Sequence, residues 1–212
     1  MDFQRELELV LPSDLPNRAR VISIAASHLA LIAEANEHMN LTRITDCREA
    51  VIKHVVDSVA PWSLFAGAAT VMDAGTGAGF PGIPLAAVLP DTRFLLVDST
   101  QKKARFVESA IAALGLENVE VAGERAEDLL RHGRFNLITA RAVAPVERTL
   151  AYFVHGIQQG ASVLLYKGPD VDSELKEAAT EAKRRHVRMD VVTRYELPDA
   201  LGGRTVVRIA PE

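Results

Sequence analysis

The stretch that decides the fold is VMDAGTGAGFPGIP, residues 71–84, which holds four glycines, two prolines and a single acid. Its first residues are typical of a buried strand and its last of a helix start. Gly75, Gly77 and Gly79 follow Asp73 at spacings of two. Glycines at such a junction allow positive φ angles and close approach of a ligand, and a helix N-terminus offers free N–H groups. We expect a loop that binds a nucleotide-like ligand where the first strand ends.

From residue 69 onward, short apolar runs alternate with segments of helical length. The predicted strands are 70–74, 93–98, 119–123, 135–140, 161–167, 187–197 and 204–210, and the predicted helices are 84–90, 102–115, 146–157 and 173–185. This alternation predicts a parallel sheet covered on both faces. Only PDALGGR separates the last two strands, so we expect them to be antiparallel. The pattern indicates an α/β, class I (Rossmann-like) methyltransferase fold with a mostly parallel seven-stranded sheet.

The first third of the chain shows helical periodicity and no strand pattern. One helix is predicted over 13–40, with Ser13 as its cap and Asn40 as its stop. A second is predicted from Asp46, which stands in capping-box spacing with Glu49, to the proline at 61. We therefore expect an N-terminal helical extension, residues 1–66, before the Rossmann-like domain, residues 67–212.

Composition limits the classes of function. Hydrophobic residues make up 48% of the 212 residues and charged residues 25%, as in an ordinary globular protein, and the net charge is −4. A chain that wraps naked nucleic acid is usually basic, so any contact with RNA must use a local patch. Cys47 is the single cysteine, which excludes an internal disulfide and fits a cytoplasmic location. The apolar stretch 21–35 is too short to span a bilayer. We expect a cytoplasmic monomer with no membrane association and no metal site.

The glycine spacing discriminates between ligands. The dinucleotide motif needs a third glycine at its sixth position, and counting from Gly75 that position is Phe80. The observed pattern is G-x-G-x-G after Asp73, and an acid so close to the loop suits a cation better than a diphosphate. S-adenosyl-L-methionine carries a sulfonium and an ammonium group and no phosphate. The loop therefore favours S-adenosyl-L-methionine, although a tight turn without a ligand is the simpler alternative.

The ends of the next two strands supply further candidates for this ligand. Asp98, followed by Ser99, ends the second strand 19 residues after Gly79, where an acid accepts both ribose hydroxyls. That feature alone is compatible with NAD as well. The third strand leads to Ala126 and Glu127, which we expect at the adenine edge. The alternatives are a helix cap for Asp98 and a solvated loop position for Glu127.

Methyltransferases for different acceptors also differ in their sequence motifs. The fourth strand runs into RAVAPV, without the Asn/Asp-Pro-Pro-aromatic motif of enzymes that methylate exocyclic amines. Enzymes that methylate carbon 5 of pyrimidines need a cysteine nucleophile, and Cys47 precedes the sheet. A ring nitrogen with a free lone pair, such as guanine N7, needs neither device. Catalysis then consists of positioning, which contributes up to roughly 7–11 kcal/mol.

Basic residues near the predicted ligand face are the candidates for RNA contacts. Arg141 and Lys167 follow the fourth and fifth strands, on the acceptor side of this fold, and Arg141 is also the candidate for positioning the reactants. The other candidates are Lys102 and Lys103 in the predicted helix 102–115, with Arg43, Lys53 and His54 in the extension. Ordinary surface charge is the alternative for the lysines and arginines, and a capping or packing role is the alternative for His54.

Seven segments in fixed order carry a resemblance to a known family. They are NLTRITD, KHVVDS, DAGTGAGFPGIPLA, LVDSTQKKARF, RAEDL, ARAVAP and LYKGP, within residues 38–170. Together they resemble the RsmG (GidB) family, bacterial methyltransferases for guanine N7 in 16S ribosomal RNA. The resemblance implies that S-adenosyl-L-methionine contacts Gly75, Phe80, Asp98, Ala126 and Glu127, with Arg141 near its reactive end. It implies one guanine of the 16S RNA, free or in the small ribosomal subunit, as acceptor.

Two other functions stay compatible with these residues. The same fold could serve a different methyl acceptor, since the donor loop does not specify one. A non-catalytic ribosome-assembly factor that only binds the donor is the second.

Overall fold

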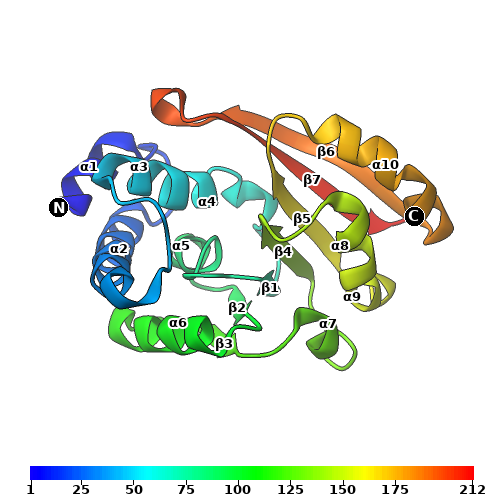
Figure 1. The fold of residues 1–212 in the computed structure, drawn as a ribbon, viewed down its shortest axis with the longest axis horizontal. Coiled ribbons are helices and arrows are strands. Elements are labelled where there is room, and N and C mark those ends of the chain that lie inside the picture. Colours follow the sequence, from blue (N-terminus) through cyan, green and yellow to red (C-terminus); the bar gives the residue numbers. More distant parts are fainter.

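The computed structural model describes all 212 residues and is built around one seven-stranded sheet (Figure 1). The strands are β1 Thr70–Ala74, β2 Arg93–Val97, β3 Val119–Ala122, β4 Leu137–Arg141, β5 Ser162–Lys167, β6 Val187–Glu196 and β7 Gly203–Pro211, in the order β3-β2-β1-β4-β5-β7-β6. β1 to β5 pair in parallel, and β7 is antiparallel to both β5 and β6. The predicted antiparallel pair and the class I fold are confirmed.

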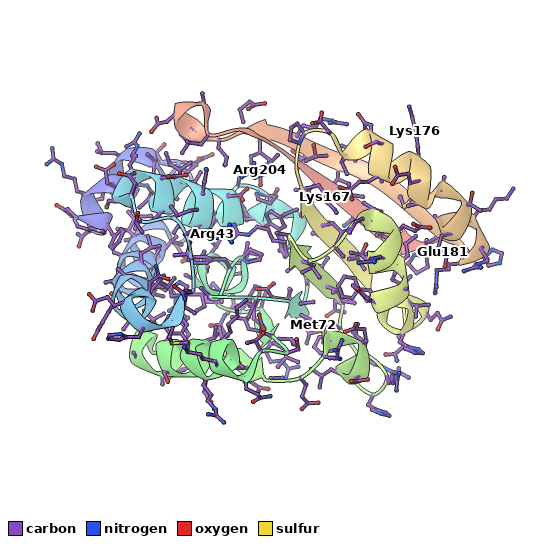
Figure 2. The ribbon with its side chains drawn as sticks, in the orientation of Figure 1. Arg43, Met72, Lys167, Lys176, Glu181 and Arg204 are labelled. Carbon is purple, nitrogen blue, oxygen red and sulfur yellow. The ribbon has the colours of Figure 1, made fainter.

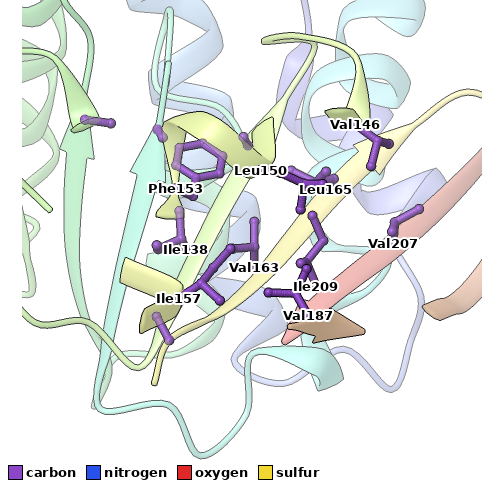
Figure 3. Close-up of a cluster of buried hydrophobic side chains, with 14 of the residues drawn as sticks. Ile138, Val146, Leu150, Phe153, Ile157, Val163, Leu165, Val187, Val207 and Ile209 are labelled. Carbon is purple, nitrogen blue, oxygen red and sulfur yellow. The ribbon is translucent and has the colours of Figure 1, made fainter. Parts of the chain in front are cut away.

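Helices cover both faces of the sheet because adjacent strand residues point to opposite faces. On one face, the side of β1 that carries Val71 packs against α5 (Gly82–Val88) and α6 (Gln101–Leu114). On the other face, the side that carries Met72 packs against α7 (Ala126–Leu129), α8 (Val146–Tyr152), α9 (Val154–Gln158) and α10 (Val171–Arg184). Figure 3 shows this second cluster, in which strand side chains such as Ile138 and Val163 meet Leu150 and Phe153 from the helices.

One predicted helix differs from the structure. The segment predicted as a single helix over 146–157 is divided into α8 and α9 at Phe153, whose φ of −104° and ψ of 9° depart from helical values. The Phe153 ring is fully buried in the cluster of Figure 3. This packing against the sheet is a tertiary effect that the helical periodicity does not reveal.

The first third of the chain is helical, as predicted. Its elements are α1 Phe3–Val10, α2 Arg18–Met39, α3 Cys47–Ala50, the π-helical turn η1 Val51–Val56, α4 Asp57–Val59 and the 3-10 turn η2 Trp62–Leu64. Asn40 ends α2 in a left-handed conformation, and Asp46 caps α3 by accepting from the Glu49 amide at 2.8 Å, both as predicted. None of the helices combines the length and the hydropathy that a membrane span requires.

Two details of the capping predictions are wrong. Ser13 does not cap α2, which begins at Arg18 after Asn17. The Asn17 side chain instead donates to the Val88 carbonyl at 2.9 Å and so ties this helix start to the end of α5. The capping box at Asp46 is only half formed, because the Glu49 carboxylate pairs with Lys53 at 2.6 Å.

The N-terminal helices share one apolar core with the glycine loop. The cluster that contains Leu7, Leu29 and Val55 also contains Phe80 from the loop and Val88 from α5. The helical segment therefore packs directly behind the loop that follows β1, and displacement of these helices would disturb the loop.

Candidate functional site

A cavity of about 340 Å³ opens at the carboxyl ends of β1, β2 and β4, where the strand order reverses. Ligands of doubly wound sheets bind at this point, and the volume lies in the roughly 300–1,000 Å³ range of small-molecule sites. Six predicted site residues line it: Gly75, Asp98, Ser99, Ala126, Glu127 and Arg141. The remaining donor candidates, Asp73, Gly77, Gly79 and Phe80, lie in or behind the loop and outside the cavity lining.

The glycine loop has the backbone geometry that the sequence predicted. Gly75, Gly77 and Gly79 have φ angles of 73°, 64° and 101°. A Cβ atom on Gly75 would lie 2.8 Å from Val143 Cγ2, and one on Gly79 would lie 2.6 Å from Ile83 Cδ1. Both positive φ and close packing therefore require glycine here.

Asp73 acts from behind this loop. It is fully buried, and its Oδ2 accepts hydrogen bonds from Thr76 Oγ1 at 2.7 Å and from the Gly82 amide at 2.9 Å. Its Oδ1 has no partner, and burial raises the pKa of Asp73 to about 6 against the lowering effect of those two hydrogen bonds. Asp73 therefore holds the loop from outside the cavity lining, and its part in donor binding stays a prediction.

Asp98 joins the two loops that border the cavity. Its Oδ2 accepts from the Gly77 amide at 3.1 Å and its Oδ1 accepts from the Thr100 amide at 2.8 Å, just before α6. The carboxylate thus stabilises the helix start, as the alternative interpretation held, and also lines the cavity. An ionised carboxylate has about four acceptor sites, so lone pairs stay available for a diol.

A second cavity of about 650 Å³ adjoins the first and shares Arg141, Ala142 and Val143 with it. Its charged lining comprises Lys53, Arg141, Lys167 and Arg204, opposed by Asp57 and Glu174. Four cations and two carboxylates leave a net charge of +2, so the cavity favours an anion. Its residues come from η1, α4, α10, the last residues of β4 and β5, the start of β7 and the segment that follows β4, with Ile44 from the segment before α3.

Arg141 lies at the boundary between the two cavities. Its Nη1 donates to the Lys53 carbonyl at 3.1 Å and to Asp57 Oδ2 at 3.2 Å. The guanidinium carbon lies 5.6 Å from the centre of the Phe80 ring. The side chain is 17% exposed, and hydrogen bonds to the protein use only Nη1, which leaves Nε and Nη2 for a ligand.

Phe80 and His54 have packing roles. The Phe80 ring is buried and stacks on His54, with centroids 4.7 Å apart and an interplanar angle of 10°, while His28 packs at the same distance on a tilt. Burial, reinforced by the Arg141 charge, lowers the pKa of His54 to about 3. His54 lines the second cavity but is neutral near pH 7, so it adds no charge to a phosphate site and the packing alternative is favoured.

The other basic candidates divide into three kinds. Lys167 is 12% exposed and its Nζ donates to the Ala144 carbonyl and to Glu174 Oε2, each at 2.7 Å, so it braces the loop after β4. Lys53 lines the second cavity and pairs with Glu49. Lys102, Lys103 and Arg43 line neither of these two cavities.

Sequence reasoning missed many of the lining residues, and three of them have polar side chains that matter for the two cavities. Tyr152 on α8 lines the first cavity, and Asp57 and Arg204 line the second. β7 runs antiparallel to β5, so the first residues of β7 lie beside Lys167 at the end of β5. Figure 2 labels Lys167 and Arg204, which come from these two strand ends. The predicted antiparallel pair contained the signal for Arg204, since it reverses which end of the last strand faces the site.

Solved structures show the same fold. TomG, an O-methyltransferase from Streptomyces achromogenes in complex with SAM, matches with a TM-score of 0.56 at 18% identity, over 96% of this chain and 93% of that one. Cofactor-bound Rv0187 from MTB matches with a TM-score of 0.56 at 20% identity, over 99% and 95%. The fold defines a class I methyltransferase, a class that uses S-adenosyl-L-methionine as methyl donor.

Sequence comparison shows the family. The model of the GidB family, rRNA small subunit methyltransferase G, matches residues 22–199. The ribosomal RNA small subunit methyltransferase G of Solibacter usitatus (strain Ellin6076) is 61% identical over 209 residues, which is 99% of this chain and 100% of that protein. The protein of the same name from Carboxydothermus hydrogenoformans is 38% identical over 192 residues, 88% and 81% of the two chains. This chain belongs to the GidB family and is an rRNA methyltransferase.

Proposed function

We propose that the protein transfers the methyl group of S-adenosyl-L-methionine to N7 of a guanine in 16S ribosomal RNA. The observation that carries this proposal is the pair of adjoining cavities that share Arg141, Ala142 and Val143. The first has the residues for the donor, and the second has the net positive charge for a nucleotide. The shared lining supports this proposal, because direct transfer requires that the donor and the acceptor lie next to each other.

The second cavity lacks an efficient general base, and this favours N7. Its two carboxylates are paired, Asp57 with Arg141 and Arg204 and Glu174 with Lys167. The pKa of His54, about 3, is far from the operating pH that an effective base needs. Guanine N7 carries a free lone pair and loses no proton when it is methylated. The chemistry therefore requires alignment alone.

In this mechanism the chain binds and orients the reactants. S-adenosyl-L-methionine supplies an electrophilic methyl group, so the N7 lone pair forms the new C–N bond while the C–S pair leaves with the neutral thioether. Asp98 accepts the ribose hydroxyls, and Ala126 and Glu127 border the adenine. Asp73 adds a negative potential behind the loop that stabilises the cationic donor. Arg141 keeps the boundary between the cavities in place.

RNA is bound through few charges. The chain carries a net charge of −4, while the acceptor cavity carries +2. A small basic patch on an acidic protein suits a structured RNA surface such as the small ribosomal subunit better than long stretches of naked RNA. Lys53 and Arg204 line the cavity and are the candidates for phosphate contacts, with Arg43 outside it.

The test is nucleoside mass spectrometry of 16S RNA. Small subunits and free 16S RNA from a strain that lacks this modification are incubated with the protein and labelled donor, and Asp98→Ala serves as the control without donor binding. We expect labelled N7-methylguanosine from the wild-type protein only. Label in another nucleoside would support a different acceptor, and no transfer from a donor that calorimetry shows to be bound would support a non-catalytic assembly factor.

A further inference from the structure

The Asp57 carboxylate accepts hydrogen bonds from side chains of three strands. It is 3% exposed, and Arg141 from β4 donates to its Oδ2 at 3.2 Å. Arg204 from β7 approaches it through Nε at 3.3 Å, and the Tyr195 hydroxyl from β6 donates to its Oδ1 at 2.9 Å. A single buried anion therefore touches both guanidinium groups that line the second cavity.

The backbone before Asp57 supplies a second acceptor for the Arg141 guanidinium. Asp57 follows the π-helical turn η1, and its amide donates to the Ile52 carbonyl, five residues earlier. In an α-helix that amide would donate to the Lys53 carbonyl, which here accepts from Arg141 Nη1. Single π-helical turns are frequent at functional sites. The widened turn thus presents two acceptors, the Lys53 carbonyl and the Asp57 carboxylate, to one guanidinium.

Stability alone is a poor explanation for this arrangement. A buried ion pair is often no more stabilising than apolar residues of similar volume, because desolvation offsets the attraction. Removal of one partner, by contrast, leaves the other charge unpaired. What the carboxylate does supply is orientation, because it pairs with Nη1 of Arg141 and Nε of Arg204. Arg204 Nη1 donates to the Gly203 carbonyl at 3.0 Å, so Nε and Nη2 of Arg141 and Nη2 of Arg204 stay available at the cavity.

We propose that Asp57 is a positioning residue for methyl transfer, which holds Arg141 at the boundary of the two cavities and Arg204 in the wall of the second. Its carboxylate is 3% exposed and both oxygens are paired, so it acts through the two arginines. This inference rests on the proposed function for its effect on rate. Its geometric content, that the carboxylate fixes the two guanidinium groups, is independent of the acceptor.

The first test is a double-mutant cycle on the full chain. Asp57→Asn keeps the shape and removes the charge, and we expect kcat/KM for small subunits to fall about 100-fold, the effect of a misplaced reacting group. Because Asp57 acts in part through Arg141, the Asp57→Asn loss will be clearly smaller in the Arg141→Ala background than in the wild type, since coupled residues are not additive. The loss that is left in that background reflects the contact with Arg204. Independent, additive losses would overturn the proposal.

Asp199→Asn is the matched control. Asp199 also links the β6–β7 hairpin to the N-terminal helices, through Arg48 at 2.8 Å, but lies outside both cavities. Its φ of 58° suits asparagine equally well. We expect it to lower the melting temperature and leave kcat/KM unchanged. An equal loss of activity from Asp199→Asn would show that hairpin docking, and not positioning, explains the Asp57 effect.

The second test needs no RNA and so separates failure of this inference from failure of the proposed function. Folded protein is treated with phenylglyoxal, and modification of the peptides that carry Arg141 and Arg204 is followed by mass spectrometry. We expect both to react severalfold faster in Asp57→Asn than in the wild type and in Asp199→Asn. Should Asp57→Asn fail to fold, Asp57→Glu keeps the charge but displaces it, and the same increase is expected. Unchanged reactivity in the folded variant would overturn the inference.

Discussion

The guanidinium of Arg141 lies 5.6 Å above the ring of Phe80, on the aromatic stack that Phe80 forms with His54 and His28. Phe80 ends the glycine loop, whereas Arg141 ends β4 and borders both cavities. The ring therefore connects the donor loop to the boundary of the acceptor cavity. A contact between a cation and an aromatic face contributes about 0.5–2 kcal/mol.

Phe80→Leu tests this connection, because leucine stays apolar but has no aromatic face. We expect a loss of about 1–3 kcal/mol in the free energy of unfolding, measured with urea, and a fall of roughly tenfold in kcat through the lost contact with Arg141. Phe65→Leu is the control, since Phe65 is equally buried but packs near Tyr166 in a different cluster. It should lose comparable stability and keep its kcat. Equal kcat values for the two variants would show that the Arg141 contact has no role in turnover.

Gly75→Ala should weaken binding of the donor. Alanine at position 75 would be strained in two ways. The φ angle is +73°, and the Cβ atom would lie 2.8 Å from Val143 Cγ2. Val143 lines both cavities, so the displaced side chain narrows the donor site. Calorimetry with S-adenosyl-L-methionine should show at least a tenfold lower affinity.

The comparison for this variant is Gly115→Ala at the end of α6. Gly115 has a similar φ of +63° but nothing within 4 Å of its Cβ position. It should cost about 1–2 kcal/mol of stability from the left-handed conformation and leave donor affinity unaltered. If both variants bind the donor equally well, the close approach of Val143 does not shape the site.

Acid should destabilise the protein through its buried histidines. His28 is fully buried, and burial lowers its pKa to about 4 against an unfolded value near 6.5. Between these values the unfolded chain binds a proton that the folded chain does not, so the stabilisation present above pH 6.5 is lost as the pH falls toward 4. At pH 5 the loss from His28 is about 2 kcal/mol, and the lowered pKa of His54 acts in the same direction.

The measurement is urea unfolding of wild type and His28→Gln at pH 7.5 and pH 5. Glutamine can donate to the Ala78 carbonyl as His28 Nε2 does at 2.8 Å, but it has no titrating group. The wild type should lose about 2 kcal/mol more than the variant over this interval. The contribution of Asp73 to the pH dependence of stability has the opposite sign, because its raised pKa of about 6 makes the folded chain bind a proton at a higher pH than the unfolded chain. This contribution is the same in the wild type and in His28→Gln. Parallel pH profiles would contradict the role of His28.

The parts of the molecule that local sequence patterns specify were predicted correctly. The seven strands follow from alternating apolar runs, and the positive φ angles of Gly75, Gly77 and Gly79 follow from glycine itself. Asp98 and Ala126 line one cavity because the carboxyl ends of parallel strands meet at the same end of the sheet. These inferences need only the order of strands and the chemistry of each residue.

Local sequence patterns could not predict contacts between residues that are far apart in the sequence. Asp57 and Arg204 are 147 residues apart, and only the folded hairpin brings them together. Lys167 donates to Glu174 and to the Ala144 carbonyl, and nothing in its local sequence indicates these two partners. The N-terminal helices bury the ring of Phe80, and its place in the glycine motif does not indicate that packing. Each of these depends on which partner lies nearby, which the residue type does not state.

Arg141→Ala and Lys102→Ala separate the acceptor side from general surface charge. Both substitutions remove one positive charge, so a purely long-range effect on RNA would be alike for the two. Arg141 lines both cavities, whereas Lys102 lies on the exposed side of α6 and its Nζ donates to the His38 carbonyl at 3.3 Å. We expect kcat/KM for small subunits to fall about 100-fold in Arg141→Ala and less than threefold in Lys102→Ala, measured at 0.1 M salt. Losses of equal size would mean that the RNA approaches from the α6 side, and that the cavity bordered by Asp57, Lys167 and Arg204 is not the acceptor site.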